Sequence, residues 1–551
     1  MNHSSNFSTA FSICLLLSLA ASTSNSPAAI MTTGSIEPDF ETLPPKDWTF
    51  SSTNAFIGYE ANGTLMITGG SEVESAVGHI GYPSGVRGAI HVTGFGSKWT
   101  NRRYVMIGEQ GEGELTIASG GEVSSAIGTI ANGAGSSGKV EVSGSEAKWK
   151  NGKAGYIGDL IIGNKGDGAL VVQNGGLVEN VMSGYIGIDP GSCGEAMVKG
   201  SGSEWTNGKN LYVAYGSTRR CTLKITGGGM VGNDHGYIGF ESGSSGEAVV
   251  KGAGSEWANT NMLNIGYNGN GKLGVSGGGM ASCGFSYIGY STGSTGLVTV
   301  DGTDSTWTID GGFYVGASGV GTLRILCGGE VASGRSSIAA NSGSTGSARV
   351  AGAGSTWKVD GDLDVGYDGA GTLSIAEGGL VQVVGQLTID KDFDGDGFIN
   401  MASGGVLAVN GWNGGTPGGF LEIVRGANAI RYWNHAAGEW VGIFTATHGR
   451  QYTLTQGTGD LAGYTLLTVT PVAESDISLL AAGGTPNEIK IVLNTPDPEN
   501  SKIQFSTDLK TWKPIADSPN FVRFDEEGPW NIAAIVTKNP GANEFYRGTT
   551  P

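Results

Sequence analysis

The residues whose type and spacing could do chemistry are four aspartates near the end of a long repeat region. Asp390, Asp392, Asp394 and Asp396 occupy every second position, and Asn400 follows four residues later. Read from Asp392, carboxylates fall at positions 1, 3 and 5 of a calcium-binding loop, with a glycine at position 6 for the sharp turn. This spacing predicts that all five residues hold a structural calcium ion. Position 12 is a serine rather than a bidentate glutamate, so a solvated acidic loop is the alternative.

Other motif matches indicate turns rather than active sites. The stretch Gly289-Tyr-Ser-Thr-Gly293 fits a nucleophile elbow, and Gly133–Gly138 fits a dinucleotide-binding pattern. Both lie within a glycine-rich repeat and not at the strand-to-helix junction that either chemistry needs. The six histidines lack metal-ligand spacing, and charged residues make up only 15% of the chain. We therefore expect no catalytic residues and no bound organic cofactor.

The cysteines do not predict a zinc site. Beyond Cys14, the chain has Cys193, Cys221, Cys283 and Cys327, and no two of them form a CxxC pair. Cys193 and Cys221 are 28 residues apart, which is close to one coil of the repeat described next. A disulfide between them is the alternative to four separate thiols, which we expect.

The element that must position these residues is a tandem repeat marked by Ile-Gly and Val-Gly dipeptides. The dipeptides recur from Ile57 to Val365, mostly at alternating intervals near 23 and 27 residues, so a unit of about fifty residues has two unequal halves. Each half carries a period-2 triplet bracketed by glycines, such as Leu373-Ser-Ile375, which is typical of a short strand with one buried face. The 99 glycines fit many tight turns. This pattern predicts a parallel β-helix; a β-propeller is the alternative, but its blades need four strands of one sequence type.

One tryptophan ends each long half of the repeat. A file of indoles at one corner has two interpretations: it plugs the corner of the core, or it forms an exposed track for sugars. An exposed file of seven indoles would promote aggregation, so the plug is favoured. The seven residues are Trp48, Trp99, Trp149, Trp205, Trp257, Trp307 and Trp357.

The repeat resembles a known family. Its pattern, G-x-G-S-x-W followed by L-x-V-G-x-x-G-x-G-x-L-x-I and then I-G-x-x-x-G-S-x-G-x-V-x-V, is similar to the type V secretion/PEP-CTERM-associated repeat over about residues 50 to 385. That repeat occurs in large bacterial surface proteins that resemble autotransporter passengers. The resemblance implies a right-handed parallel β-helix outside a bacterial cell. The last residues, Arg547-Gly-Thr-Thr-Pro551, match neither the barrel nor the PEP-CTERM tail of such proteins, so the resemblance leaves export and anchoring open.

The chain divides into five segments by composition. The apolar run Phe11–Ala21, followed by small residues, predicts an export signal, and no later run is long enough to cross a bilayer. We therefore expect a secreted or cell-surface protein with no transmembrane segment after signal removal. The expected segments are a signal peptide (1–29), an N-terminal cap (30–50), the β-helix (51–410), a C-terminal β cap (411–470) and a small β-sandwich-like domain (471–551).

Charge and regularity limit the expected function. A net charge of -18 without a basic cluster excludes nucleic acid as a partner. Regular coils favour a non-catalytic surface protein with a role in adhesion, display or extracellular matrix, whose partner is an extracellular polysaccharide or another cell surface. The alternative is a carbohydrate-active β-helix enzyme, a polysaccharide lyase or hydrolase, that uses acidic residues near positions 390–400.

Overall fold

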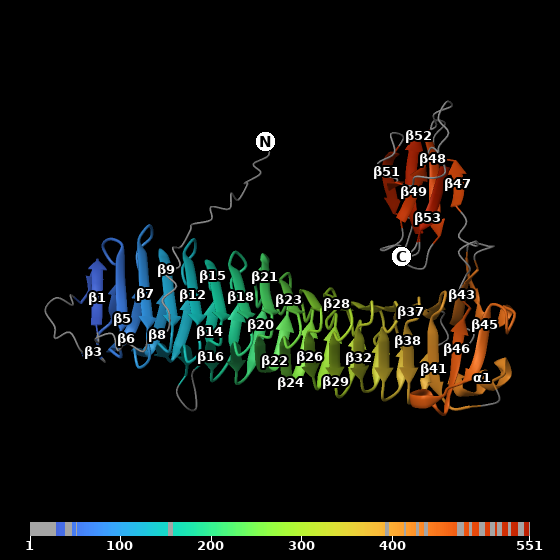
Figure 1. Ribbon diagram of the computed structural model, residues 1–551, viewed down its shortest axis with the longest axis horizontal. Helices are drawn as coiled ribbons and strands as arrows, with labels where there is room; N and C mark the ends of the chain where they lie inside the picture. The colour runs from blue at the N-terminus through green and yellow to red at the C-terminus, as the bar shows by residue number, and fades with distance from the viewer. Residues whose placement is uncertain are drawn as a thin grey trace.

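The chain folds into a long parallel β-solenoid (Figure 1). The computed structural model describes residues 29–38, 47–50, 52–152, 158–391, 396–412, 415–425, 429–434 and 439–470. It also describes the strands at 479–483, 488–494, 502–506, 513–514, 521–526, 531–537 and 545–549. Side chains are described from residue 52 to 470 within these ranges, and at 29–38. The predicted all-β class and parallel β-helix are confirmed, with about fourteen coils. At about 4.8 Å per coil, the solenoid is about 65–70 Å long.

Three parallel ladders form the faces of the solenoid. In the first ladder, seven-residue strands recur every 25 residues over most of the array, for example from Thr295 to Val320 to Thr345. Its strands are β5 (Gly63–Thr68), β7 (Arg87–Thr93), β9 (Glu112–Ala118), β12 (Ser137–Ser143), β15 (Asp167–Gln173), β18 (Cys193–Lys199), β21 (Arg220–Thr226), β23 (Ser245–Lys251), β25 (Asn270–Ser276), β28 (Thr295–Asp301), β31 (Val320–Leu326), β34 (Thr345–Ala351), β37 (Ala370–Ala376), β40 (Gly397–Met401) and β43 (Ile430–Asn434).

The second ladder carries the tryptophans. Its strands are β3 (Asp47–Phe50), the first parts of β6 (Glu72–Ile80), β8 (Lys98–Ile107), β22 (Met230–Ile238) and β24 (Glu256–Ile265), and β10 (Glu122–Ser125), β13 (Lys148–Asn151), β16 (Leu177–Asn180), β19 (Glu204–Asn207), β26 (Met280–Cys283), β29 (Thr306–Ile309), β32 (Glu330–Ser333), β35 (Thr356–Val359), β38 (Leu380–Val383) and β41 (Val406–Asn410).

Most strands of the third ladder end at the Ile or Val that precedes a corner. Its strands are β4 (Ala55–Ile57), the last parts of β6, β8, β22 and β24, and β11 (Ile127–Ile130), β14 (Leu160–Ile162), β17 (Gly184–Ile186), β20 (Asn210–Val213), β27 (Phe285–Ile288), β30 (Phe313–Val315), β33 (Ser336–Ile338), β36 (Leu363–Val365), β39 (Leu387–Ile389) and β42 (Val424–Arg425).

The Ile-Gly dipeptide recurs because each of its residues meets a separate constraint at a corner. Ile288 is fully buried in the core. Gly289 has φ +71°, and an added Cβ would lie 2.3 Å from the carbonyl oxygen of Val320 in the next coil. A branched side chain is therefore needed for the core, and a small residue with positive φ is favoured where two coils touch. Ala131, Ala214 and Ala339 take the place of the glycine in three other coils, with φ of 57°, 61° and 59°.

The tryptophans plug the core, as predicted. Trp99, Trp149, Trp205, Trp257, Trp307 and Trp357 are fully buried, whereas the side chain of Trp48 lies outside the described residues. Each indole lies between smaller residues of the neighbouring coils. Trp149, for example, lies between Val123 and Val178 in the ladder. Large and small residues therefore alternate from coil to coil in this ladder.

Glycines of the third ladder make room for the indoles. A Cβ on Gly128 would lie 2.5 Å from Cζ2 of Trp149, and a Cβ on Gly184 would lie 2.8 Å from Cζ2 of Trp205. The first four buried indoles have such a glycine in the preceding coil, and Ser286 and Ser336 take this position for the last two. The core is thus close-packed across coils and not only within them.

Antiparallel strands cover both ends of the solenoid. At the start, β1 (Ala29–Gly34) pairs with β5 and β2 (Ile36–Glu37) pairs with β4. At the other end, β44 (Glu439–Gly442) pairs with β43, and β46 (Tyr464–Val469) pairs with β41 and with β45 (Tyr452–Gln456). The helix α1 (Pro417–Ile423) and the short 3-10 turns Ile443–Thr445 and Gly459–Leu461 lie in the same region. These strands therefore cover the edges of the first and third ladders at the start and of the first and second ladders at the far end.

The C-terminal region forms two further antiparallel sheets. One has the order β47 (Leu479–Gly483), β48 (Glu488–Asn494), β52 (Asn531–Thr537) and β51 (Phe521–Glu526). The other has the order β50 (Lys513–Pro514), β49 (Lys502–Ser506) and β53 (Phe545–Thr549). In the described part of the chain, no helix has the length and apolar character of a bilayer-crossing segment.

Candidate functional site

The predicted calcium residues lie at the loop before β40 and within that strand. Asp392 and Asp394 lie outside the described residues. Asp390, with φ +54°, follows the buried Ile389, and a Cβ on Gly397 would lie 2.6 Å from the backbone nitrogen of Asp390. The two ends of the loop, Asp390 and Asp396, are therefore neighbours.

Asn400 lies apart from that loop. It is in register with Ser374 and Arg431 inside β40, so its Cα is about 13 Å along the strand from Asp396. Among the described residues, no three His, Cys, Asp or Glu side chains gather as a metal-binding group. Calcium binding stays a prediction that depends on Asp392 and Asp394.

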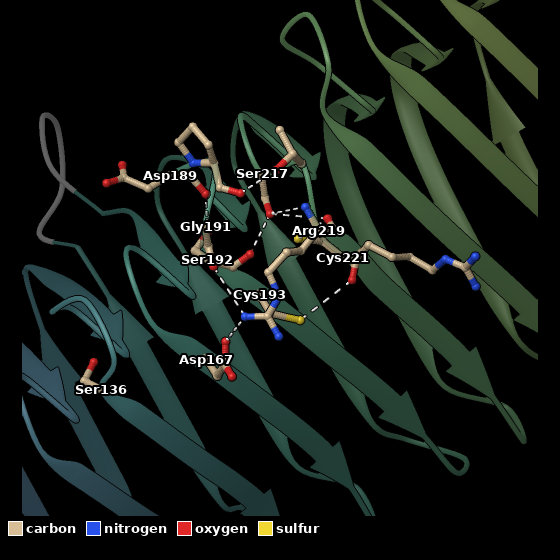
Figure 2. Close-up of polar contacts among 12 residues, drawn as sticks. Ser136, Asp167, Asp189, Gly191, Ser192, Cys193, Ser217, Arg219 and Cys221 are labelled. Carbon is tan, nitrogen blue, oxygen red and sulfur yellow. Dashed lines mark hydrogen bonds and ion pairs between the residues drawn. The ribbon is translucent and has the colours of Figure 1, made fainter. Parts of the chain in front are cut away.

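The four cysteines of the described chain form no disulfide. Along β18, Cys193 is on the outer side of the sheet, whereas Cys221 on the adjacent β21 points into the core. Figure 2 shows the two thiols near backbone carbonyls, with Cys193 Sγ 3.7 Å from the Arg220 oxygen and Cys221 Sγ 3.7 Å from the Arg219 oxygen. Arg219 reaches across two coils to an ion pair with Asp167. Burial raises the pKa of the core thiol Cys283 to about 12.

A strip of nine aromatic rings lies on the outside of the third ladder and its following corner. We call it the aromatic strip. Most of its rings are half-buried, Tyr212 is 9% exposed and Tyr290 is 36% exposed. The strip contains Tyr185, Tyr212, Tyr215, Tyr237, Phe240, Tyr267, Tyr287, Tyr290 and Tyr314.

Strand geometry places these rings outside the core. In Tyr237-Ile-Gly-Phe240, the isoleucine points inward, so the residue before it points outward, and Phe240 points outward after the corner. Stacking of coils then aligns equivalent residues of successive units, as the register Tyr185 to Tyr212 to Tyr237 shows. Two rows of rings result, one before the corner and one after it.

The two rows interlock. In the first row, the rings of Tyr185 and Tyr212 stack with centroids 5.0 Å apart, and Tyr287 stacks on Tyr314 at 4.9 Å. The second row stacks in the same way from Tyr215 through Phe240 and Tyr267 to Tyr290. Rings of different rows meet nearly at right angles, as for Tyr212 and Phe240 at 4.8 Å. Stacked and edge-to-face geometry are the favourable arrangements for aromatic pairs.

Asn264 interrupts the first row. It is in register between Tyr237 and Tyr287 and is only 1% exposed. Neither end of its carboxamide has a hydrogen-bond partner among the described residues. A buried amide without partners is costly, so this position is the weak point of the strip.

A cleft of about 670 Å³ opens where both rows end. Tyr287, Tyr290 and Tyr314 form one wall, and Ala317 and Ala340 take the corner positions at which earlier coils carry rings. Polar atoms come from Ser291, Thr292, Ser318 and Asn341, and none of the lining residues is charged. The cleft thus combines ring surfaces with uncharged hydrogen-bonding groups, which is the usual composition of a site for a small polar molecule.

The polar side chains of the cleft are held by neighbours in adjacent coils. Ser291 Oγ donates to Asn268 Oδ1 at 2.6 Å, and Asn341 Nδ2 donates to Ser318 Oγ at 2.9 Å. These bonds fix the side-chain orientations before any ligand arrives. Preorganisation of this kind lowers the entropy cost of binding.

Four phenols of the strip resist ionisation. Burial, followed by the proximity of Tyr212 and Tyr267, raises the pKa of Tyr237 to about 12. Burial also raises the pKa values of Tyr185, Tyr212 and Tyr287. These four phenols therefore stay neutral donors and acceptors at all physiological pH values.

Sequence reasoning missed the aromatic strip. The signal was present in the residues that flank each Ile-Gly dipeptide, such as Tyr287 and Tyr290 around Ile288-Gly289. The regular spacing of the tryptophans made them the candidates for an exposed track, but the described ones lie inside the core. No family model, no curated protein and no solved structure matches this chain.

Proposed function

We propose that this protein is a non-catalytic, exported β-solenoid that acts in adhesion, display or extracellular matrix through its outer surface. The observation that carries the proposal is the aromatic strip, because rings that face outward over several coils contribute nothing to the interior core. A row of partly exposed aromatic rings supports an interaction surface, because apolar groups at the surface of soluble proteins mark interaction sites where they are contiguous. The partner that we propose is an extracellular polysaccharide or another cell surface.

Export is part of the same proposal. The apolar run Phe11–Ala21 supports it, although these residues lie outside the described chain. A bacterial surface protein of the type V secretion/PEP-CTERM-associated repeat family would fit both the run and the repeat. Recovery of Met1-containing protein from the cytosol of the native host would count against export.

Adhesion without catalysis is tested on the purified full-length protein. Immobilised protein is offered bacterial cells and extracellular matrix, and retention is scored against a surface coated with albumin. In parallel, the soluble protein is incubated with polysaccharides, and new reducing ends and unsaturated products are measured. We expect retention without cleavage. Release of oligosaccharides would replace the proposal with the polysaccharide lyase or hydrolase.

A further inference from the structure

We propose that the cleft at the end of the aromatic strip binds an uncharged polysaccharide chain, which continues along the strip parallel to the solenoid axis. This inference rests on the proposed adhesive function and assigns it a site and a ligand class. It is carried by three features of the cleft: open ring faces, fixed polar groups and the absence of charge.

Ring faces become accessible at the cleft, where both rows end. Inside the second row a ring is covered on both sides by its neighbours, as Tyr267 is between Phe240 and Tyr290. Tyr290 and Tyr314 are the last rings of their rows, and the next coil offers Ala317 and Ser337 in their place. The apolar C–H face of a sugar ring fits such a flat, wide surface, and large aromatic surfaces supply most of the energy of binding at such sites.

The polar rim matches the hydroxyl groups of a sugar. Thr292 and Asn341 are exposed, and Ser291 and Ser318 are half-buried beside them. Since Ser291 and Asn341 each use one donor for a neighbouring coil, their remaining lone pairs and the second amide hydrogen of Asn341 stay available. A sugar, whose every hydroxyl both donates and accepts, can satisfy such a mixed set.

Charge selects against anionic polymers. None of the residues that line the cleft is a cation that could pair with a carboxylate or sulfate. The whole chain has a net charge of -18, so its field repels polyanions. A neutral glycan is therefore the polymer that this cleft fits.

The strip extends the site beyond one sugar ring. From β17 to β30 the strip crosses six coils, or about 24 Å at the coil spacing of about 4.8 Å. A chain that leaves the cleft along the axis meets partly exposed tyrosine edges and hydroxyls coil after coil. Weak contacts repeated along one polymer add up to useful affinity.

The test measures binding of full-length protein to soluble polysaccharides by affinity electrophoresis and calorimetry. The uncharged probes are mixed-linkage β-glucan, xyloglucan, galactomannan and amylose, and the anionic probes are alginate and polygalacturonate. We expect at least one uncharged probe to bind and both anionic probes to fail. The variants Tyr290→Ala and Asn341→Ala should each weaken binding about tenfold or more, as loss of a central contact does.

The controls separate the site from the fold. Tyr104→Ala is the matched control, because Tyr104 is 40% exposed on β8, outside the strip, and its loss should leave affinity unchanged. Asn341 is an exposed side chain, so Asn341→Ala tests the site even if Tyr290→Ala alters the melting temperature. Unchanged affinity in both cleft variants would overturn the assignment.

Three outcomes separate this inference from the proposed function. If the protein retains cells but binds none of the uncharged probes, the inference fails and adhesion stands. If Tyr290→Ala converts a dimer into a monomer in sedimentation velocity, the strip is an interface between copies and the inference also fails. If a probe binds and is cleaved, the non-catalytic function itself is wrong.

Discussion

At the scale of single residues, one β-carbon decides which glycines of the solenoid can be replaced. Two glycines of β25 make the comparison on the same strand. A Cβ on Gly271 would lie 2.2 Å from the nitrogen of Gly266 and 2.6 Å from the oxygen of Ile238, whereas a Cβ on Gly274 would meet nothing within 4 Å. The first glycine separates touching coils and the second faces solvent.

We therefore expect opposite effects from the same substitution. Gly271→Ala should lower the free energy of unfolding by more than about 3 kcal/mol, since backbone rather than a flexible side chain must move. Gly274→Ala should raise the free energy of unfolding by about 0.4–1 kcal/mol, because alanine lowers the conformational entropy of the unfolded chain and causes no strain in the folded one. Thermal and urea melts of the two variants measure both effects. Equal destabilisation by both would mean that glycine is needed for strand flexibility and not for contact between coils.

The raised pKa of Tyr237 predicts a loss of stability in alkali. Its folded pKa of about 12 is above the usual value of 10.0, so the native state holds the proton more tightly than the unfolded state between these values. The contribution of Tyr237 to the free energy of unfolding is fully present below pH 10 and is lost as the pH rises from 10 to about 12. Tyr237→Phe should reduce this slope in melting temperature against pH, and tyrosinate absorbance should lose its late-ionising component. An identical slope in wild type and variant would place the alkaline sensitivity elsewhere.

At the scale of elements, inward-facing residues were predictable and outward-facing ones were not. The repeated Ile-Gly, the Leu-x-Ile triplets and the tryptophans could be aligned because each one fits a fixed volume inside a close-packed core. Outer positions have no such constraint: the residue before the dipeptide is Tyr237 in one coil, Asn264 in the next and Tyr287 after that. A periodicity search therefore finds the ladders and overlooks the strip.

The same limit applies to the calcium loop. The alternation of aspartates predicted ligands by sequence position alone, but the strand β40 begins at Gly397, which places Asn400 on a sheet rather than in the loop. Asp390 follows Ile389 with positive φ, so it occupies the corner position that Gly289 takes in another coil. Asp390 is thus both a corner residue of the repeat and a residue of the calcium motif, and sequence spacing alone cannot tell which role it has.

Calcium should nevertheless stabilise the protein if the loop binds it. Three carboxylates in one short loop repel each other unless a cation neutralises them. Affinity in the ~10⁻⁴–10⁻³ M range of extracellular modules, at about ten times Kd, corresponds to about 1.4 kcal/mol. Melts of the full chain in calcium, with equal magnesium as the control for ionic strength, measure the shift. The triple variant Asp392→Asn, Asp394→Asn, Asp396→Asn should abolish it, and a wild-type melt that calcium does not move would leave a solvated acidic turn.

At the scale of the whole molecule, the strands of each central coil pair with those of its two neighbours. Stability in such an array is close to a sum over coils and over the interfaces between them. Two kinds of interface alternate here, because a tryptophan coil lies between two coils with a smaller residue and only the preceding one carries the glycine or serine that makes room for the indole. Trp307 has Ala281 on one side and Val331 on the other, and Val331 in turn meets Trp357. The natural unit of the array is therefore two coils and not one.

Deletions within the array test this unit. Val320, Thr345 and Ala370 are equivalent positions in register, 25 residues apart. Removing residues 320–369 takes out two coils and joins Trp307 to Val381, which keeps the alternation. Removing residues 320–344 takes out one coil and brings Trp307 against Trp357. The two-coil deletion should melt cooperatively near the wild-type temperature and be shorter by about 10 Å in solution scattering.

The one-coil deletion should be far less stable, although it removes less of the protein. Two indoles would compete for the volume now filled by one indole and one valine, and overpacking of a rigid core costs about 1–3 kcal/mol or more. Adding Trp357→Val to the one-coil deletion removes one of the two indoles and should recover much of the lost stability. If the shortened chain were defective for another reason, this substitution would not restore it. Circular dichroism melts of the two deletion proteins and of the one-coil deletion with Trp357→Val, each compared with wild type, measure these differences in stability. Similar melting temperatures for both deletions would show that single coils are interchangeable and that the alternation of tryptophan with smaller residues does not govern the packing.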